Sequence, residues 1–233
     1  MKKRKKKPYK QSYRWIYDAI LSKLYDTGLK IGLTPPGERI LRMSVFKSIS
    51  PFIRRNYRIL DLGCGTGTLT ILLSNLLYSD CELIGVDLSN GQIVKAQKKN
   101  SISNVTFKFM DAVNLQFDNE SFDIVIISAV LHEMVGKERI KVLKEVYRVL
   151  KNQGYLLIFD HHEPSKTRRR VFYNFYLGFW EKFLSQSFEM QRKIFFELKD
   201  VGFSILSQAP VKKFHNFFQN ILCKKDFKEK QSI

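Results

Sequence analysis

The stretch Asp61-Leu62-Gly63-Cys64-Gly65-Thr66-Gly67 decides the fold that this sequence predicts. The short run 57–60 before it is typical of a strand, and residues 69–73 after it are typical of a helix. A glycine-rich turn between a strand and a helix lets a ligand approach the backbone and directs the first N–H groups of the helix toward it. Dehydrogenase sites have the spacing G-x-G-x-x-G, whereas here Gly67 follows Gly65 by only two residues. The spacing therefore favours a different cofactor.

Strands and helices alternate after this turn. The apolar patterns predict strands at 57–62, 81–87, 104–110, 122–128 and 153–160, and helices at 67–78, 89–100 and 136–150. Two further strand-like runs, 203–208 and 212–222, follow a helix that ends near Gly202. Residues 13–50 have helical spacing, which Thr34-Pro35-Pro36-Gly37 interrupts and Pro51 ends. This order predicts an α/β fold with a parallel sheet and helices on both faces.

Composition limits the classes of protein that fit. The 233 residues are 44% hydrophobic, enough for one well-buried domain with an accessory segment. The formal charge is +18, and residues 2–10 supply seven of the positive charges, so the remainder carries 18 − 7 = +11. A basic body with a basic arm fits nucleic acid or an anionic membrane surface, and equally a solvated, lysine-rich surface with a disordered tail.

Cysteine usage and hydropathy point to the cytoplasm. Cys64, Cys81 and Cys223 are far apart and show no metal spacing, which favours a reducing compartment. The charged start, Met1 to Pro8, has no apolar core behind it, so no secretory signal is expected. No apolar run approaches the roughly 18–20 residues that span a bilayer.

The acid Asp61 followed by G-x-G-x-G resembles the cofactor loop of the class I S-adenosylmethionine-dependent methyltransferases. The resemblance implies S-adenosylmethionine as cofactor and S-adenosylhomocysteine as product. It implies that Asp61 approaches the amino-acid end of the cofactor. The loop residues that would cradle the cofactor are Gly63, Cys64, Gly65 and Gly67.

Strand ends supply the other expected cofactor contacts. Asp87, 20 residues after Gly67, can accept hydrogen bonds from both ribose hydroxyls, with Leu88 against the adenine and Ser89 capping the next helix. In this superfamily an acid after the third strand commonly faces the adenine amino group, which makes Asp111, with Ala112 beside it, the candidate; a loop-capping role is the alternative. Ser128 and Ala129 should lie behind the methionine part.

Two histidine segments follow buried strands. His132 at the edge of the crevice is a candidate general base for a phenol, enol or amine, and packing against the cofactor or capping the loop is the alternative. His161-His162-Glu163 places two adjacent imidazoles on an extended chain, and no third partner has a useful spacing. We therefore expect no metal site, and expect one of these histidines to line the pocket.

The block Lys141–Gly154 resembles the stretch before the fifth strand of small-molecule methyltransferases, and the ubiquinone/menaquinone biosynthesis methyltransferases are most similar. Tyr25-Asp26, the segment Phe159–Pro164 and Val201-Gly202-Phe203 carry this resemblance. It implies a Rossmann-like seven-stranded, mostly parallel sheet in the order 3-2-1-4-5-7-6, with strand 7 antiparallel and N-terminal helices capping the site. It also implies a small, lipophilic, quinone-type or aromatic acceptor, although Val130-Leu131-His132-Glu133 stands where that family carries a Gly-Leu-Arg-Asn-like segment.

Two alternatives stay open for the acceptor. The dense aromatic residues after Arg168-Arg169-Arg170 could form core, a lid over the acceptor or a membrane-facing surface, which would suit a phospholipid headgroup N-methyltransferase peripheral to an anionic membrane. An RNA-directed enzyme is disfavoured, because base N-methyltransferases carry Pro-Pro and an aromatic residue where this chain has Ser128-Ala129-Val130-Leu131. The sequence gives no oligomeric state.

The expected organisation has three parts. Residues 1–12 form a disordered basic arm and 13–55 a helical cap, from which Tyr17 or Tyr25 closes the cofactor site. Residues 56–233 form the methyltransferase core, including an aromatic helix within 165–200.

Overall fold

The computed structural model describes residues 35–164, 167, 170–171, 187–212 and 216–226. Tyr17, Tyr25, the basic arm and most of the aromatic segment lie outside these residues. In the described part, no helix is both long and apolar enough to cross a bilayer.

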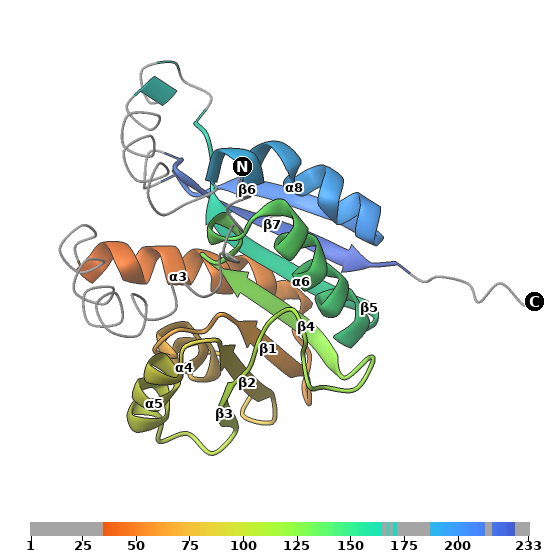
Figure 1. Cartoon of the computed structure of the whole chain (residues 1–233). Coiled ribbons are helices and arrows are strands. Elements are labelled where there is room, and N and C mark those ends of the chain that lie inside the picture. The colour runs from red at the N-terminus through yellow and green to blue at the C-terminus, as the bar shows by residue number, and fades with distance from the viewer. Residues whose placement is uncertain (1–34, 165–166, 168–169, 172–186, 213–215, 227–233) are drawn as a thin grey trace, which may run out of the picture.

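A seven-stranded sheet forms the centre of the molecule (Figure 1), in the order β3-β2-β1-β4-β5-β7-β6. Strands β1 to β5 pair in parallel, and β7 is antiparallel to both β5 and β6. The strands are β1 (Arg58–Leu62), β2 (Glu82–Asp87), β3 (Val105–Phe109), β4 (Phe122–Ser128), β5 (Leu150–His161), β6 (Phe203–Pro210) and β7 (Phe218–Lys225). This order confirms the predicted fold.

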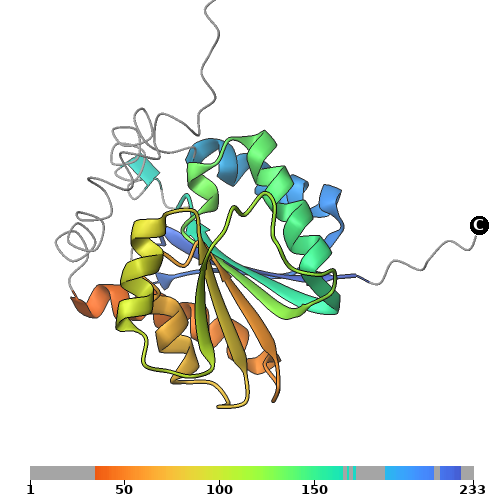
Figure 2. The same cartoon turned by 60° about the horizontal axis from the view of Figure 1, so that its bottom comes forward.

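Helices cover both faces of the sheet (Figures 1 and 2). On one face lie α3 (Pro35–Ile49), α4 (Thr68–Ser74) and α5 (Asn90–Lys99), and on the other lie α6 (Gly136–Val149) and α8 (Ser187–Val201). Because both faces are covered, β4 is buried at every position from Ile124 to Ile127. Each fully buried aliphatic side chain contributes about 1.5–3 kcal/mol by leaving water.

Most predicted boundaries lie within a few residues of the observed ones. The clear error is the last strand, which the sequence placed at 212–222 and which spans Phe218–Lys225. The antiparallel strand follows β6 after only the short connection 211–217, and its buried run continues to Lys225, whose Nζ donates to Leu150 O at 2.6 Å. Of the segment 13–55, which was predicted to be a helical cap, the structure describes α3, which ends at Ile49, and a 3₁₀ turn at Ser50–Phe52 that contains Pro51.

Candidate active site

The glycine loop contains three glycines with different surroundings. All three have left-handed backbone angles, with φ of +76° at Gly63, +54° at Gly65 and +72° at Gly67. A Cβ at Gly63 would lie 2.3 Å from Val130, and a Cβ at Gly67 would lie 2.4 Å from Phe107, so packing alone requires glycine at both positions. A Cβ at Gly65 would meet nothing within 4 Å. Gly65 is therefore the glycine that leaves open space for a ligand.

Asp87 holds this loop in place from the neighbouring strand. Its Oδ2 accepts a hydrogen bond from Gly65 N at 2.9 Å, and its Oδ1 accepts one from Ser89 N at 2.8 Å. Ser89 also caps α5 as predicted, because its hydroxyl accepts from Gln92 N at 3.3 Å. These two backbone bonds fix the Asp87 carboxylate at the end of β2, where the ribose of the cofactor is expected.

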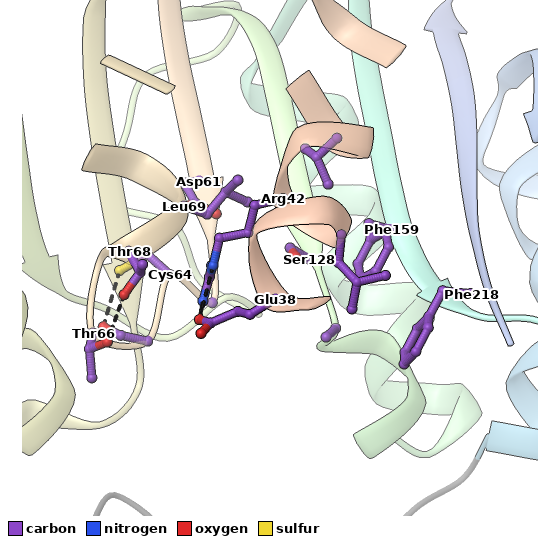
Figure 3. A pocket seen from close by; sticks show the side chains of 15 residues that line it. Glu38, Arg42, Asp61, Cys64, Thr66, Thr68, Leu69, Ser128, Phe159 and Phe218 are labelled. Carbon is purple, nitrogen blue, oxygen red and sulfur yellow. Dashed lines mark hydrogen bonds and ion pairs between the residues drawn. The ribbon is translucent and has the colours of Figure 1, made fainter. Parts of the chain in front are cut away.

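A pocket of about 120 Å³ lies between the glycine loop and α3 (Figure 3). A site for a whole small molecule usually has 300–1,000 Å³, so this pocket fits one end of a cofactor. Its lining combines some of the predicted residues, but not Gly67 or Asp87, with others from the glycine loop, α3, α4, β5 and β7: Glu38, Leu41, Arg42, Val45, Asp61, Gly63, Cys64, Gly65, Thr66, Thr68, Leu69, Ser128, Ala129, Phe159 and Phe218.

Asp61 is the buried acid of this pocket, with 2% of its surface exposed. Its Oδ2 accepts from the Thr70 hydroxyl at 2.6 Å, and its Oδ1 has no hydrogen-bond partner among the described residues. Burial raises the pKa of Asp61 to about 6, although the Thr70 bond and the charge of Arg42 oppose this shift. A buried carboxylate with an unsatisfied oxygen fits the ammonium group of an amino acid.

The ion pair of Glu38 and Arg42 was missed by the sequence argument. Arg42 Nη2 lies 2.5 Å from Glu38 Oε1, one helical turn apart on α3, and both side chains line the pocket together with Asp61, which is drawn next to Arg42 (Figure 3). The available signal was the i, i+4 spacing of an acid and a base in the helix before the glycine loop. Arg42 is thus the cation that borders the same cavity as Asp61.

The expected adenine contacts lie at adjacent strand ends, outside the pocket lining. Met110 N donates to Asp87 O at 3.0 Å, which brings the end of β3 beside the end of β2. Asp111 Oδ1 accepts from Val113 N at 3.1 Å, the loop-capping bond that was the alternative reading. Ala112 is half-buried, and Leu88 is 38% exposed, which leaves an apolar surface at the strand ends.

His132 lies in a 3₁₀ turn, Leu131–Glu133, directly after β4. Its Nδ1 is 2.8 Å from Oδ1 of Asp160, a fully buried residue near the end of β5. Asp160 Oδ1 also accepts from His161 N at 2.8 Å, and Oδ2 accepts from Leu131 N and His132 N at 3.1 and 3.3 Å. Four donors therefore fix one carboxylate, which in turn fixes the imidazole.

The charges of this group shift the pKa values of both histidines. Burial alone would lower the pKa of His132, but the charge and hydrogen bond of Asp160, helped by Glu133, outweigh burial and raise it to about 9. Burial and the adjacent His132 cation lower the pKa of His161 to about 3, so His161 is neutral. The pair formed by His132 and Asp160 is therefore the ionisable element at this edge of the sheet.

The expectation that no third partner lies near the His161 segment is wrong. The turn after β4 brings His132 to Asp160 and His161, and one potential ligand atom of each lies within 4.8 Å of the others. Sequence spacing could not show this, because His132 and Asp160 are joined only through the pairing of β4 with β5. Both oxygens of Asp160 already accept two hydrogen bonds each, and we assign no metal here.

A series of rings connects His132 to the pocket. The rings of His132 and His161 meet edge to face at 4.6 Å, His161 lies 5.1 Å from Phe218, and Phe218 stacks on Phe159 at 5.4 Å. His132 does not itself line the pocket, whereas Phe159 and Phe218 do. The predicted base is thus connected to the aromatic wall of the cavity through the ring of His161.

The comparisons with known proteins agree with this geometry. A family model described as a methyltransferase domain matches residues 53–216, which include the glycine loop and the ends of all five parallel strands. The chain belongs to this methyltransferase family. Membership confirms the resemblance to class I S-adenosylmethionine-dependent methyltransferases and the predicted cofactor.

Two curated relatives of this methyltransferase carry quinones in their names. The demethylmenaquinone methyltransferase of Staphylococcus epidermidis is 29% identical over 69% of this chain and 66% of the relative, so the match spans just under two thirds of its length. The ubiquinone/menaquinone biosynthesis C-methyltransferase UbiE of Idiomarina loihiensis is 30% identical over 53% of this chain and 50% of its own.

Solved structures share the fold of this methyltransferase. A methyltransferase of Methanosarcina mazei superposes with a TM-score of 0.62 at 21% identity, covering 78% of this chain and 98% of that one. The [4+2]-cyclase SpnF superposes with a TM-score of 0.73 at 18% identity, covering 95% and 98%. Because a cyclase shares the fold, the acceptor chemistry must be argued from the site.

Proposed function

We propose that this methyltransferase methylates a hydroxylated aromatic ring of the quinone type, with His132 as the general base. The observation that carries the proposal is the 2.8 Å contact between His132 Nδ1 and the buried carboxylate of Asp160, at the carboxyl edge of the sheet beside the pocket. Ligands of open parallel sheets bind at this edge. A carboxylate that holds Nδ1–H leaves Nε2 as the nitrogen that accepts a proton when His132 is neutral, a form that becomes abundant only as the pH approaches its pKa of about 9.

The cofactor would lie across the ends of β1, β2 and β3. S-adenosylmethionine supplies the methyl group as a sulfonium that transfers by in-line displacement. The unsatisfied Oδ1 of Asp61 would accept from its ammonium group, Arg42 would pair with its carboxylate, and Gly65 would leave space for it. For the rest of the cofactor, we propose that Gly63, Cys64, Gly67 and Ser128 contact the methionine part and that Asp87 binds the ribose. Leu88, Asp111 and Ala112 would contact the adenine. Tyr17 and Tyr25 remain proposed caps over the site.

The acid–base role of His132 follows from its surroundings. Removing the proton of a ring hydroxyl raises the electron density of that oxygen and of the ring carbons ortho and para to it, so either atom can attack a methyl donor. Asp160 stabilises the imidazolium that forms when His132 takes this proton. Neutral His161 contacts the His132 ring without competing for the proton.

The aromatic wall supports a planar acceptor. Phe159 and Phe218 border the pocket that fits one end of the cofactor, and the series of rings continues beyond it through His161 to His132, where an aromatic substrate would gain offset or edge contacts. The relatives' names, demethylmenaquinone methyltransferase and ubiquinone/menaquinone C-methyltransferase, support the same class of acceptor.

Transfer of a labelled methyl group tests the proposal. The enzyme is incubated with labelled S-adenosylmethionine and, in separate reactions, reduced short-chain demethylmenaquinone, phosphatidylethanolamine vesicles and transfer RNA. We expect label only in the quinol, and a loss of roughly 10²–10⁴ in turnover in His132→Gln. Label in the lipid or the RNA, or an unchanged His132→Gln enzyme, would contradict the proposal.

A further inference from the structure

Arg139 is the largest fully buried side chain in the part of the chain that the structure describes. It lies in the first turn of α6, where the positive end of the helix disfavours a cation. Removing a charge from water is also costly unless partners compensate for it. Neither burial in the core nor the position in the helix favours an arginine here, so the contacts of its guanidinium must account for this residue.

The guanidinium joins three segments of the chain. Its Nε and Nη2 donate to the two oxygens of Glu197 on α8 at 2.6 and 2.7 Å, and its Nη1 donates to Met134 O at 2.8 Å. Glu197 is 3% exposed, so the pair is buried on both sides. A Cβ at Gly136 would lie 3.2 Å from Glu189 Oε1 and 3.5 Å from Arg139 Nη2, so a glycine there leaves room for this cluster.

Met134 ends the turn that carries His132. Its N–H donates to Leu131 O at 3.2 Å, closing the turn Leu131–Met134, which we call the base turn. At its start, Leu131 N and His132 N donate to Asp160 Oδ2. At its end, Met134 O accepts from Arg139. Two buried charged groups therefore hold the base turn from its two ends.

We propose that Arg139, held by Glu197, is a positioning residue that fixes the base turn so that the His132 imidazole meets Asp160. The inference rests on the proposed role of His132 as base. Asp160 fixes only the start of the turn, and Arg139 fixes its end and connects it to α8. The pair would thus act on the reaction through His132, without touching cofactor or acceptor.

This role can be separated from stability. Replacing a buried ion pair by apolar residues of similar volume is often neutral or stabilising, whereas removing one partner alone is not. The double variant Arg139→Met/Glu197→Leu should therefore keep the fold and lose the bond to Met134 O. A matched control is Arg148→Met/Glu145→Leu, which removes another arginine of α6 that pairs with a glutamate and donates to the loop carbonyls of Leu115 and Phe117, away from the base turn.

The measurement is a pH titration of the His132 ring by NMR in the cofactor-free protein, which needs no acceptor. The charged and titratable groups that face His132 are Asp160, Glu133 and His161. We expect the midpoint to fall by at least one pH unit in Arg139→Met/Glu197→Leu, and to stay at the wild-type value in the control. Turnover should fall at least tenfold while the Kd for S-adenosylmethionine changes less than twofold.

A second variant covers the case in which the double variant does not fold. Arg139→Lys keeps the charge next to Glu197, but its shorter side chain lacks the guanidinium fork that reaches Glu197 and Met134 O from different nitrogens, so we expect a weaker hold on Met134 O and the same direction of shift. A folded double variant, or a folded Arg139→Lys protein, with the wild-type His132 midpoint would overturn the inference. A failure of the proposed function would be detected by a different experiment, because the His132→Gln enzyme would then still transfer the methyl group.

Discussion

The two halves of the site are built in different ways. The proposed cofactor half is built mainly on one continuous strand–turn–helix, β1 to α4, which Asp87 of the next strand anchors and which α3 borders. The proposed acceptor half consists of side chains from three separate segments: His132 after β4, Phe159 to His161 in β5, and Phe218 in β7. A continuous motif specifies binding of a common cofactor, whereas converging side chains can vary and so determine the acceptor.

The largest effect should come from filling the cofactor half. Gly65→Arg places a long side chain at the open position of the loop, and its φ of +54° is strained for any residue other than glycine. We expect calorimetry to show at least a 1,000-fold loss of affinity for S-adenosylmethionine. The control Gly91→Ala, in α5, should bind normally, because only Ser89 Oγ lies near its Cβ, at 3.8 Å.

Asp160→Asn should disable the acceptor half and spare the cofactor half. An amide cannot accept hydrogen bonds from all four donors that Asp160 satisfies, and it removes the charge that raises the pKa of His132. We expect turnover to fall by about 10³-fold, since both orientation and proton affinity are lost. The Kd for S-adenosylmethionine should change less than threefold; an equal loss of affinity would show that the halves are not separate.

Asp61→Asn should bind S-adenosylmethionine more weakly and should be more stable to unfolding at pH 8. The folded-state pKa of Asp61 is raised to about 6 from 3.8, so its stabilising contribution is complete below pH 3.8 and is lost as pH rises through 6. Asparagine mimics the protonated acid, so at pH 8 we expect denaturant unfolding to show a gain of about 1–3 kcal/mol that disappears near pH 4. Affinity for S-adenosylmethionine should fall about tenfold. A less stable variant at pH 8 would refute the role of buried charge.

Phe218→Leu should have the smallest effect, confined to the acceptor. The leucine stays apolar but loses the ring contacts with Phe159 and His161, which are worth about 0.5–1.5 kcal/mol each. We expect a 3- to 10-fold rise in the KM for reduced demethylmenaquinone with an unchanged KM for the cofactor. A rise in the cofactor KM instead would place Phe218 in the other half.

The sequence predicted how the residues of the proposed cofactor half are placed in the fold, because the geometry of this segment is local; their contacts with the cofactor remain predictions. The G-x-G-x-G spacing, the strand-end acids and the alternation of strands place Asp61, Gly65 and Asp87 at one edge of a parallel sheet. Local pattern did not show that Gly63 and Gly67 are required by contacts with Val130 and Phe107. Such contacts join residues that are far apart in the chain.

The acceptor half was predicted only in part for the same reason. His132 was selected by its place after a buried strand, but its partner Asp160 was not, because 28 residues separate them and only strand pairing joins them. Glu38 and Arg42 were not predicted as site residues, because i, i+4 ion pairs are common on helix surfaces. Only the structure shows that α3 borders the pocket. Nothing in the sequence around Arg139 indicated that its side chain is buried or that it contacts Met134 O.

The most direct test of the central claim, that His132 oriented by Asp160 is the base, is the pH dependence of kcat/KM for reduced demethylmenaquinone, which reports the ionisation of the free enzyme. The raised pKa of His132 leaves it protonated at neutral pH. We predict that kcat/KM rises about tenfold per pH unit from pH 7, levels off near pH 9, and loses this rise in His132→Gln. A wild-type profile that is flat over this range, or the same rise in His132→Gln, would contradict the account.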